Sequence, residues 1–168
     1  ANYFTYDAAP DPADPARGWR AMPDRVGRVA PPQAPFHLND ARRAEDRAAG
    51  IYHWTGPITD YADRNQELNG QMAGLDDLNT ESPAVRRALR KAYGDWITAV
   101  GVDAFRVDTA FYVPPDYFDD FLDAADPEAP GIRAVARAAG REDFLVFGEG
   151  YGIDRPYQDI QSRKIAQY

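Results

Sequence analysis

Two short apolar runs, each ending on an acidic residue, constrain the fold of this chain more than any other feature. Residues 102–108 read VDAFRVD and residues 143–149 read DFLVFGE. Both runs have the length and apolar character of buried strands. Side chains alternate across a strand, so Arg106 and Asp108 should share one face. A permanent cation beside a carboxylate keeps it ionised, as a nucleophile requires.

The segments around these runs predict how the two strands are arranged. Residues 83–100 carry an apolar stripe at helical spacing, and Gly101 is a suitable cap. Two shorter helices are predicted over residues 115–124 and 131–139. The order strand, helix, strand implies a parallel pair joined by a crossover connection. Parallel strands end at the same edge, so we expect Asp108 and Glu149 to meet there across a cleft.

The charged residues of the first helix are Arg86, Arg87, Arg90 and Lys91. Charges along one helix usually form a solvated face, and we interpret these in that way rather than as a binding patch.

These residues resemble glycoside hydrolase family 13, the α-amylase family. Residues 101–108 match its nucleophile motif, Gly-x-x-x-Phe-Arg-x-Asp, and the pair 148–149 matches the Gly-Glu that ends its acid/base strand. Residues 75–79 are similar to the family's Leu-Pro-Asp-Leu-Asn segment, with Asp76 in place of proline. The three motifs occur in the family's order.

The resemblance implies a fragment of a (β/α)8 barrel around its fourth and fifth strands. A complete barrel needs about 250 residues, and this sequence has 168. Residues 1–74 would form the excursion after the third strand, called domain B, and residues 75–168 would form the partial barrel. The many prolines of residues 7–35 predict a long loop there. The alternative is a small domain that uses amylase-like segments.

The resemblance also implies a role for each residue of the motifs. Asp108 would be the nucleophile, Glu149 the acid/base, and Arg106 would keep Asp108 charged and oriented. Retaining glycosidases hold these two carboxyls roughly 5 to 5.5 Å apart. The family's third acid belongs to strand seven, which these residues do not reach, so we expect the fragment alone to be inactive. The alternative for both acids is that they cap the helices that follow them.

Aromatic residues near the motifs are candidates for substrate binding. Amylases that act on long starch chains often have Lys-His where this chain has Phe111 and Tyr112. An aromatic pair offers a stacking surface for sugars and favours short or cyclic oligosaccharides, or transfer. Tyr151 is a third candidate. Packing beneath a loop is the alternative for the aromatic pair.

A calcium ion is the one cofactor that the resemblance suggests. The aspartate of the family's Leu-Pro-Asp-Leu-Asn segment is a ligand in calcium-dependent members, and it corresponds to Asp77. Calcium prefers oxygen ligands. The alternative is that Asp77 braces the loop before the helix.

Composition excludes several classes of partner. The net charge of -8 disfavours nucleic acid and anionic membrane surfaces, whereas neutral sugars remain compatible. No apolar run approaches the roughly 20 residues needed to span a bilayer. The sequence contains no cysteine, which excludes disulfides and thiolate metal sites. The compartment stays open, although the family's tendency slightly favours secretion.

Three functions are compatible with these patterns. The first is a retaining hydrolase acting on the α-glucosidic bonds of starch-type oligo- or polysaccharides. The second is a glucan-transferring or isomerising relative, because a glycosyl-enzyme can be resolved by water or by a sugar hydroxyl. The third is a non-catalytic sugar-binding homologue, which would be free to lose the acids that this chain retains.

Overall fold

The computed structural model describes residues 4–6, 13–14, 16–21 and 33–150 of the chain. The chain divides into two compact units, Ala1–Val85 and Arg86–Tyr168, and each is described by itself. The predicted division after residue 74 stays a prediction.

The second unit contains the parallel strand pair that the sequence predicts. Strands β5 (Ala104–Val107) and β6 (Leu145–Gly148) are paired in parallel, with Arg106 opposite Phe147 and Val107 opposite Gly148. One further step along this register brings Asp108 opposite Glu149. The two acids therefore follow neighbouring strands at the same edge.

Helices fill the connections, as the apolar spacing predicts. Helix α3 (Pro83–Asp95), which begins in the first unit, continues into the π-helical turn η1 (Trp96–Val100) and stops at Gly101, whose φ of 84° is left-handed. Helices α4 (Pro115–Asp123) and α5 (Ile132–Ala138) follow β5. The predictions are confirmed, except that the last five residues of the first helix are π-helical. The wider turn lets the amides of Gly101 and Val102 both donate to the Trp96 carbonyl.

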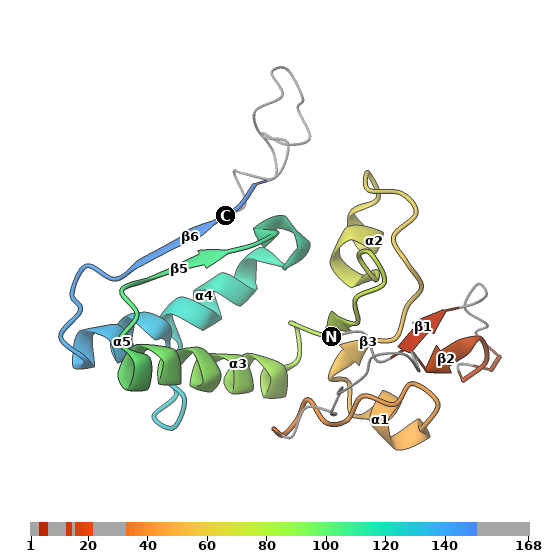
Figure 1. The fold of residues 1–168 in the computed structure, drawn as a ribbon, viewed down its shortest axis with the longest axis horizontal. Helices are drawn as coiled ribbons and strands as arrows, with labels where there is room; N and C mark the ends of the chain where they lie inside the picture. Colours follow the sequence, from red (N-terminus) through yellow and green to blue (C-terminus); the bar gives the residue numbers. More distant parts are fainter. Residues whose placement is uncertain (1–3, 7–12, 15, 22–32, 151–168) are drawn as a thin grey trace, which may run out of the picture. The chain divides into compact units, whose positions relative to one another are not determined.

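The helices cover only one face of the strand pair. The core of this unit contains Ile97, Tyr117, Phe121, Ile132 and Ala136, and Phe105, Phe144 and Val146 of the strand segments pack against it. Figure 1 shows β5 and β6 side by side with α3, α4 and α5 on one side of them.

The opposite face of the pair is open in the described part of the chain. Leu145 and Phe147 are 56% and 48% exposed there. Arg106 and Asp108 are also exposed. The two faces of this sheet thus differ: one is packed by helices, and the other presents the predicted catalytic residues to solvent.

One cation of α3 is buried, which corrects the interpretation of a wholly solvated charged face. Arg90 is only 5% exposed. Its Nε donates to the Ala129 carbonyl at 2.8 Å, and its terminal nitrogens bind Asp120 and Asp126. Ala129 and Asp126 belong to the loop between α4 and α5, and Asp120 belongs to α4. Apolar spacing does not reveal a contact between such distant residues.

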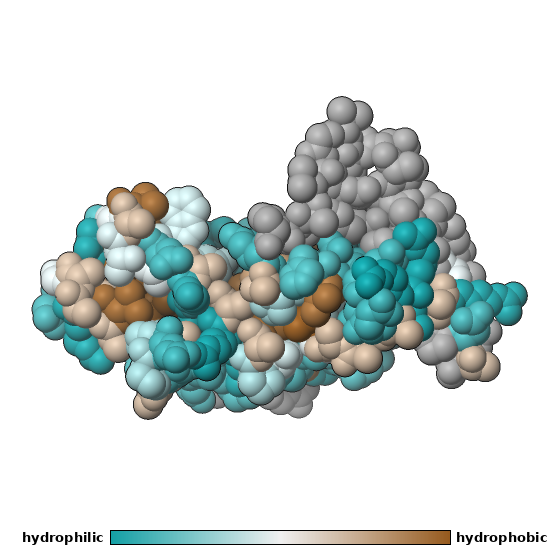
Figure 2. Space-filling model, turned by 90° about the horizontal axis from the view of Figure 1, so that it is seen from below, coloured by the Kyte–Doolittle hydropathy of each residue, from teal (hydrophilic) through white to brown (hydrophobic). Residues whose placement is uncertain are grey.

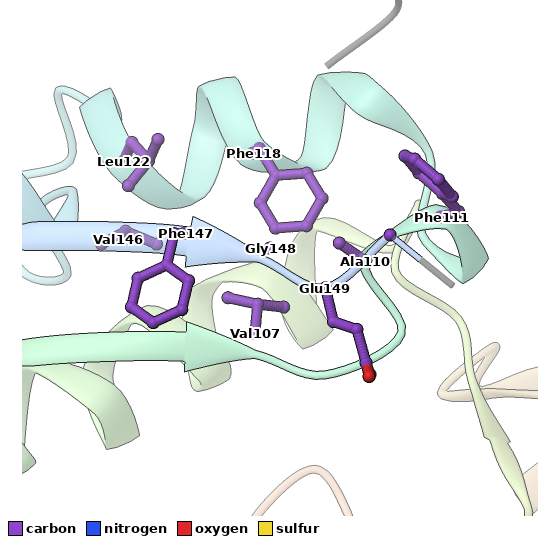
Figure 3. Close-up of a pocket in the computed structure, with 10 residues that line it drawn as sticks. Val107, Ala110, Phe111, Phe118, Leu122, Val146, Phe147, Gly148 and Glu149 are labelled. Atoms are coloured by element: carbon purple, nitrogen blue, oxygen red, sulfur yellow. The ribbon is translucent and has the colours of Figure 1, made fainter. Parts of the chain in front are cut away.

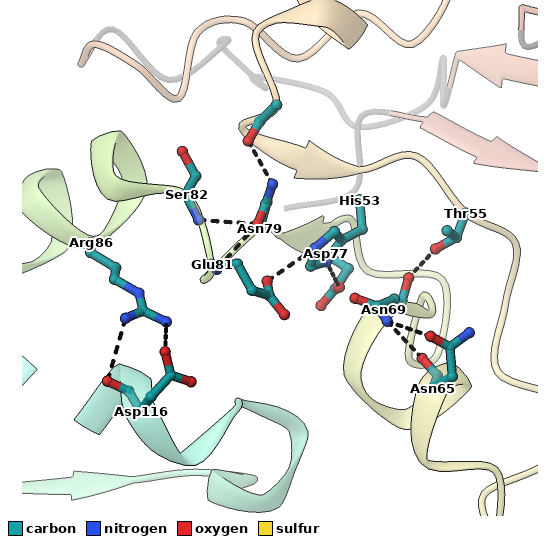
Figure 4. Close-up of polar contacts among 11 residues, drawn as sticks. His53, Thr55, Asn65, Asn69, Asp77, Asn79, Glu81, Ser82, Arg86 and Asp116 are labelled. Carbon is teal, nitrogen blue, oxygen red and sulfur yellow. Dashed lines mark hydrogen bonds and ion pairs between the residues drawn. The ribbon is translucent and has the colours of Figure 1, made fainter. Parts of the chain in front are cut away.

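The two arginines before Arg90 differ: Arg87 is half-exposed, as predicted, whereas the Arg86 side chain is only 13% exposed. Arg87 pairs with Asp126 at 3.4 Å and with Glu128. Arg86 binds the Asp116 carboxylate at 2.8 Å, as Figure 4 shows.

The first unit is built from short elements. Strand β1 (Phe4–Tyr6) pairs antiparallel with β2 (Trp19–Ala21), and β3 (Tyr52–His53) pairs antiparallel with β4 (Asp77–Leu78). The prediction of a loop throughout residues 7–35 is wrong at β2, because pairing with β1 overrides a weak local pattern.

Polar side chains hold the helices and turns of this unit. Helix α1 (Ala44–Ala48) contains Asp46, which is buried and accepts from the Asp40 amide at 2.9 Å. Helix α2 (Arg64–Asn69) is capped by Asp63, whose carboxylate accepts from the amides of Asn65 and Gln66. Carboxylates at helix N-termini satisfy amides that have no partner within the helix.

The surface is mainly hydrophilic on the face drawn in Figure 2, with smaller hydrophobic areas between the polar ones. Among the residues that the structure describes, no helix has the length and apolar character needed to cross a bilayer.

Candidate active site

The turn after β5 and the end of β6 hold the two acids together. The Glu149 amide donates to the Val107 carbonyl at 2.7 Å, and the Ala110 amide donates to the Glu149 carbonyl at 3.2 Å. These bonds extend the strand pairing beyond Gly148, so the main chain fixes Glu149 beside the turn that carries Asp108.

Arg106 connects the two carboxyl groups. Its Nη1 lies 3.3 Å from Asp108 Oδ2, and its Nη2 lies 3.0 Å from Glu149 Oε1. One guanidinium therefore contacts both acids, each through a different nitrogen. A planar cation with several donors suits this bridging role better than a lysine would.

The surroundings of Asp108 favour its ionised form. A hydrogen bond with the Glu149 carboxyl, followed in importance by the hydrogen bond and charge of Arg106, lowers the pKa of Asp108 below its ordinary value. Asp108 therefore remains a carboxylate at neutral pH. The structure thus brings the two acids together at adjacent strand ends through Arg106, and the cleft between them and their catalytic roles stay predictions.

An apolar cavity of about 300 Å³ lies beside this pair. Its lining includes Val107 and Val146 from the strands, Phe118 and Leu122 from α4, and Glu149. Figure 3 shows Phe118 and Leu122 pointing from α4 toward the strands, while the Glu149 carboxylate points away from α4. The cavity is thus mainly apolar, and Glu149 is one of its lining residues.

Two of the predicted substrate-binding aromatics, Phe111 and Tyr112, lie in the 3-10 turn η2 (Ala110–Tyr112). Phe111 is 8% exposed and lines the apolar cavity, which fits the alternative of packing beneath a loop. Tyr112 is half-buried. Tyr151 lies outside the described residues. Sugar stacking by these three residues stays a prediction.

Asp77 is paired with a histidine, which the sequence did not reveal. His53 lies opposite Asp77 in the register of β3 and β4, and its Nδ1 is 2.7 Å from Asp77 Oδ2. Its other ring nitrogen, Nε2, is 3.1 Å from Glu81 Oε2. Figure 4 shows the imidazole between the two carboxylates. No periodic pattern links residues 53, 77 and 81, so sequence analysis missed this cluster.

Burial and charge oppose each other in this cluster. Burial disfavours the imidazolium, but the hydrogen bond and charge of Asp77, with those of Glu81, outweigh it and raise the pKa of His53. Burial raises the pKa of Asp77, and the contact with His53 opposes that shift.

The fit to calcium is limited in the described part of the chain. No group of three histidine, cysteine or acidic side chains there could hold a metal ion. Oδ2 of Asp77 is engaged by His53, whereas calcium requires six to eight oxygen ligands. The observed arrangement matches the alternative in which Asp77 braces the segment before α3, and calcium stays a prediction.

Comparison with known proteins assigns the family. Residues 26–157 match the model of the α-amylase catalytic domain. The chain therefore belongs to the α-amylase family, glycoside hydrolase family 13, as a partial catalytic domain.

Individual relatives agree with this assignment. An α-amylase of Streptomyces lividans is 34% identical over 165 residues, which is 90% of this chain and 16% of that protein. A cyclomaltodextrin glucanotransferase of Klebsiella oxytoca is 31% identical over 61% of this chain and 14% of its own length.

A solved structure also resembles the chain. The α-amylase of Geobacillus thermoleovorans, determined in complex with acarbose, has a TM-score of 0.51 and 28% identity, and the match covers 62% of this chain and 21% of that one. The chain thus spans about a fifth or less of the length of these relatives.

Proposed function

We propose that this chain is part of a retaining glycoside hydrolase that cleaves α-glucosidic bonds of starch-type oligo- or polysaccharides. In this proposal β5 and β6 are the fourth and fifth strands of a (β/α)8 barrel, and residues 1–74 are domain B. One observation carries the proposal: Arg106 holds Asp108 and Glu149 together at neighbouring strand ends. Barrel enzymes place their active sites at this edge.

The first chemical step uses both acids. An Asp108 oxygen attacks the anomeric carbon with its lone pair and forms a glycosyl ester. The bond from that carbon to the glycosidic oxygen breaks, and the leaving oxygen takes the electron pair and the proton of Glu149. The leaving sugar departs as an alcohol.

The second step reverses these roles. Glu149, now a carboxylate, takes a proton from water while the water oxygen attacks the anomeric carbon. The ester bond breaks and Asp108 recovers its charge. Two inversions give net retention at the anomeric carbon.

Arg106 supports both steps through charge. It favours the anionic state of Asp108, which is the attacking form. Retaining glycosidases hold their two carboxyl groups roughly 5 to 5.5 Å apart. A bound sugar would insert its anomeric carbon and glycosidic oxygen between them, and Arg106 would then keep its contacts to both.

Substitution of each acid tests the proposal, and all activity measurements use the complete enzyme of which this chain is a part. We expect Asp108→Asn and Glu149→Gln to lower kcat on maltooligosaccharides on the order of 10⁴-fold. Asp123→Asn is the matched control, because Asp123 is an exposed acid of α4 whose partner is Arg133; it should keep its activity. NMR of fresh product should show the α-anomer first. Full activity of Asp108→Asn, or a β-anomer as first product, would refute the proposal.

Glucan transfer is a second candidate, favoured by the Phe111 and Tyr112 pair and by the similarity to a glucanotransferase. A sugar hydroxyl would then replace water in the second step. Chromatography of products from maltooligosaccharides distinguishes the two, because transfer yields cyclic or longer products and hydrolysis yields shorter ones. A sugar-binding homologue without activity would show no turnover before or after substitution.

A further inference from the structure

We propose that the turn at Thr109 and Ala110, together with Gly148, positions the acid/base Glu149. This inference rests on the proposed function and assigns positioning roles to residues other than Asp108, Glu149 and Arg106. Three independent features of the turn support it.

The first feature is the backbone conformation of Thr109. Its φ of 48° and ψ of 44° are left-handed. A β-branched residue rarely adopts this region, because its side chain crowds the main chain, and such strain persists only where the surrounding structure imposes it. The conformation therefore has a structural cause in its neighbours.

The second feature is the set of bonds that this conformation directs toward Glu149. The Thr109 amide lies 3.4 Å from Glu149 Oε2, and the Ala110 amide donates to the Glu149 carbonyl at 3.2 Å. Arg106 contacts the other carboxylate oxygen, Oε1. The two oxygens of Glu149 thus have separate partners, which fixes the rotation of its carboxyl group.

The third feature is the close approach of Gly148 to the turn. A Cβ atom at Gly148 would lie 2.7 Å from the Ala110 Cβ, a distance that real Cβ atoms essentially never show. Only glycine therefore permits the strand end to approach the turn so closely. A side chain here would push the turn and Glu149 apart.

Displacement of Glu149 should impair protonation of the leaving group more than attack by Asp108. Maltooligosaccharides require a proton on the departing oxygen, whereas fluoride leaves α-maltosyl fluoride without such help. A general acid contributes 10² to 10⁴-fold, and a misplacement of about 1 Å costs on the order of 10²-fold. The ratio of activities on the two substrates therefore reports the position of Glu149.

The experiment compares kcat/KM of Gly148→Ala on maltopentaose and on α-maltosyl fluoride. We expect a loss of roughly 10²-fold on maltopentaose and less than about 5-fold on the fluoride. The double variant Gly148→Ala/Ala110→Gly removes the clashing methyl group and should restore most of the lost activity. Equal losses on both substrates, no loss on either, or no recovery in the double variant would overturn the inference.

A second pair of variants keeps the inference testable if Gly148→Ala does not fold, as thermal melting would show. Thr109→Pro removes the amide and forbids a positive φ, whereas Thr109→Gly keeps the amide and permits that φ. We expect the proline variant to be about 10²-fold less active than the glycine variant on maltopentaose, with similar activities on the fluoride. Equal activities on maltopentaose would contradict the inference.

The failure of this inference can be distinguished from the failure of the proposed function. If Glu149→Gln itself retains activity on maltopentaose, the proposed function fails. If Glu149→Gln is inactive there but the turn variants are not selectively impaired, only this inference fails.

Discussion

The two units of this chain are held together by different interactions. In the second unit, apolar side chains of α4, α5 and η1 pack on one face of a two-stranded sheet, and Ile97 and Ile132 are fully buried. In the first unit, the strands are two or three residues long. Carboxylates and amides such as Asp46, Asp63 and Asn79 bind its main chain, beside a few buried apolar side chains.

This difference affects how each unit can position its side chains. A packed sheet aligns two strand ends with a regular spacing, which suits a pair of acids that must act on one atom. Short segments tied by polar side chains can follow an irregular path at low cost in apolar area. Buried polar groups require partners in both cases.

The buried cation Arg90 of the second unit provides the largest test of whether buried polar contacts stabilise this unit. Arg90→Met removes the partner of Asp120, Asp126 and the Ala129 carbonyl. Removal of Arg90 takes the buried cation away from Asp120 and from the Ala129 carbonyl, while Asp126 keeps Arg87, so we expect the free energy of unfolding to fall by about 3 to 5 kcal/mol. Urea unfolding followed by tryptophan fluorescence measures the change.

Arg87→Met is the matched control for Arg90→Met. Its side chain lies on the same helix and also contacts Asp126, but it is half-exposed, so we expect a loss below about 1 kcal/mol. Equal effects of the two variants would show that burial does not determine the contribution of these cations.

Arg106 tests whether the exposed sheet face is arranged for chemistry. Arg106→Gln removes one of the contacts that lower the pKa of Asp108, so this pKa should rise toward its ordinary value. Because activity requires ionised Asp108, the acid limb of the pH–rate profile should move to higher pH. We expect kcat/KM near neutral pH to fall roughly 10- to 100-fold, because both carboxyls lose their orienting partner.

Arg106→Lys sharpens this test, because it keeps the charge and loses the planar pair of donors. It should move the acid limb less than Arg106→Gln does. An unchanged limb in both variants would mean that Arg106 does not set the ionisation of Asp108.

Asn79 provides the corresponding test in the first unit. Its Oδ1 accepts from the amides of Glu81 and Ser82 at 3.1 Å, and its Nδ2 donates to the Gly50 carbonyl at 2.9 Å. Asn79→Ala should lower local stability by about 1 kcal/mol. Hydrogen exchange of the Glu81 and Ser82 amides would report this as faster opening.

The control for Asn79→Ala is Asn65→Ala. Asn65 is exposed on α2, and its side chain accepts only from Asn69 among the bonds that the structure shows for it. Exchange at Glu81 and Ser82 should not change in this control. A similar acceleration in both variants would argue against specific bracing by Asn79.

The same contrast explains how much of the fold could be predicted from the sequence. Strands β5 and β6 and helices α3, α4 and α5 have periodic apolar residues, and these elements were predicted within a few residues of their observed bounds. The left-handed cap at Gly101 was also predictable, because glycine favours that conformation. A periodic pattern of apolar residues indicates both the type of element and the face of it that packs against the core.

The remaining features depend on contacts between distant residues. The burial of Arg90, the pairing of β1 with β2, and the position of His53 between Asp77 and Glu81 have no local signal. At the candidate site, the meeting of Asp108 and Glu149 followed from parallel strand order. The left-handed turn at Thr109 did not, because a threonine gives no indication of a positive φ.

The central claim is that Asp108 acts as the nucleophile and Glu149 as the acid/base. The most direct measurement is mass spectrometry of the protein after reaction with 5-fluoro-α-D-glucosyl fluoride, whose glycosyl-enzyme is hydrolysed slowly. We predict one added fluoroglucosyl group, located on Asp108 by peptide analysis and absent from Asp108→Asn. A label on another residue, or an unmodified protein that still turns over the reagent, would contradict the account.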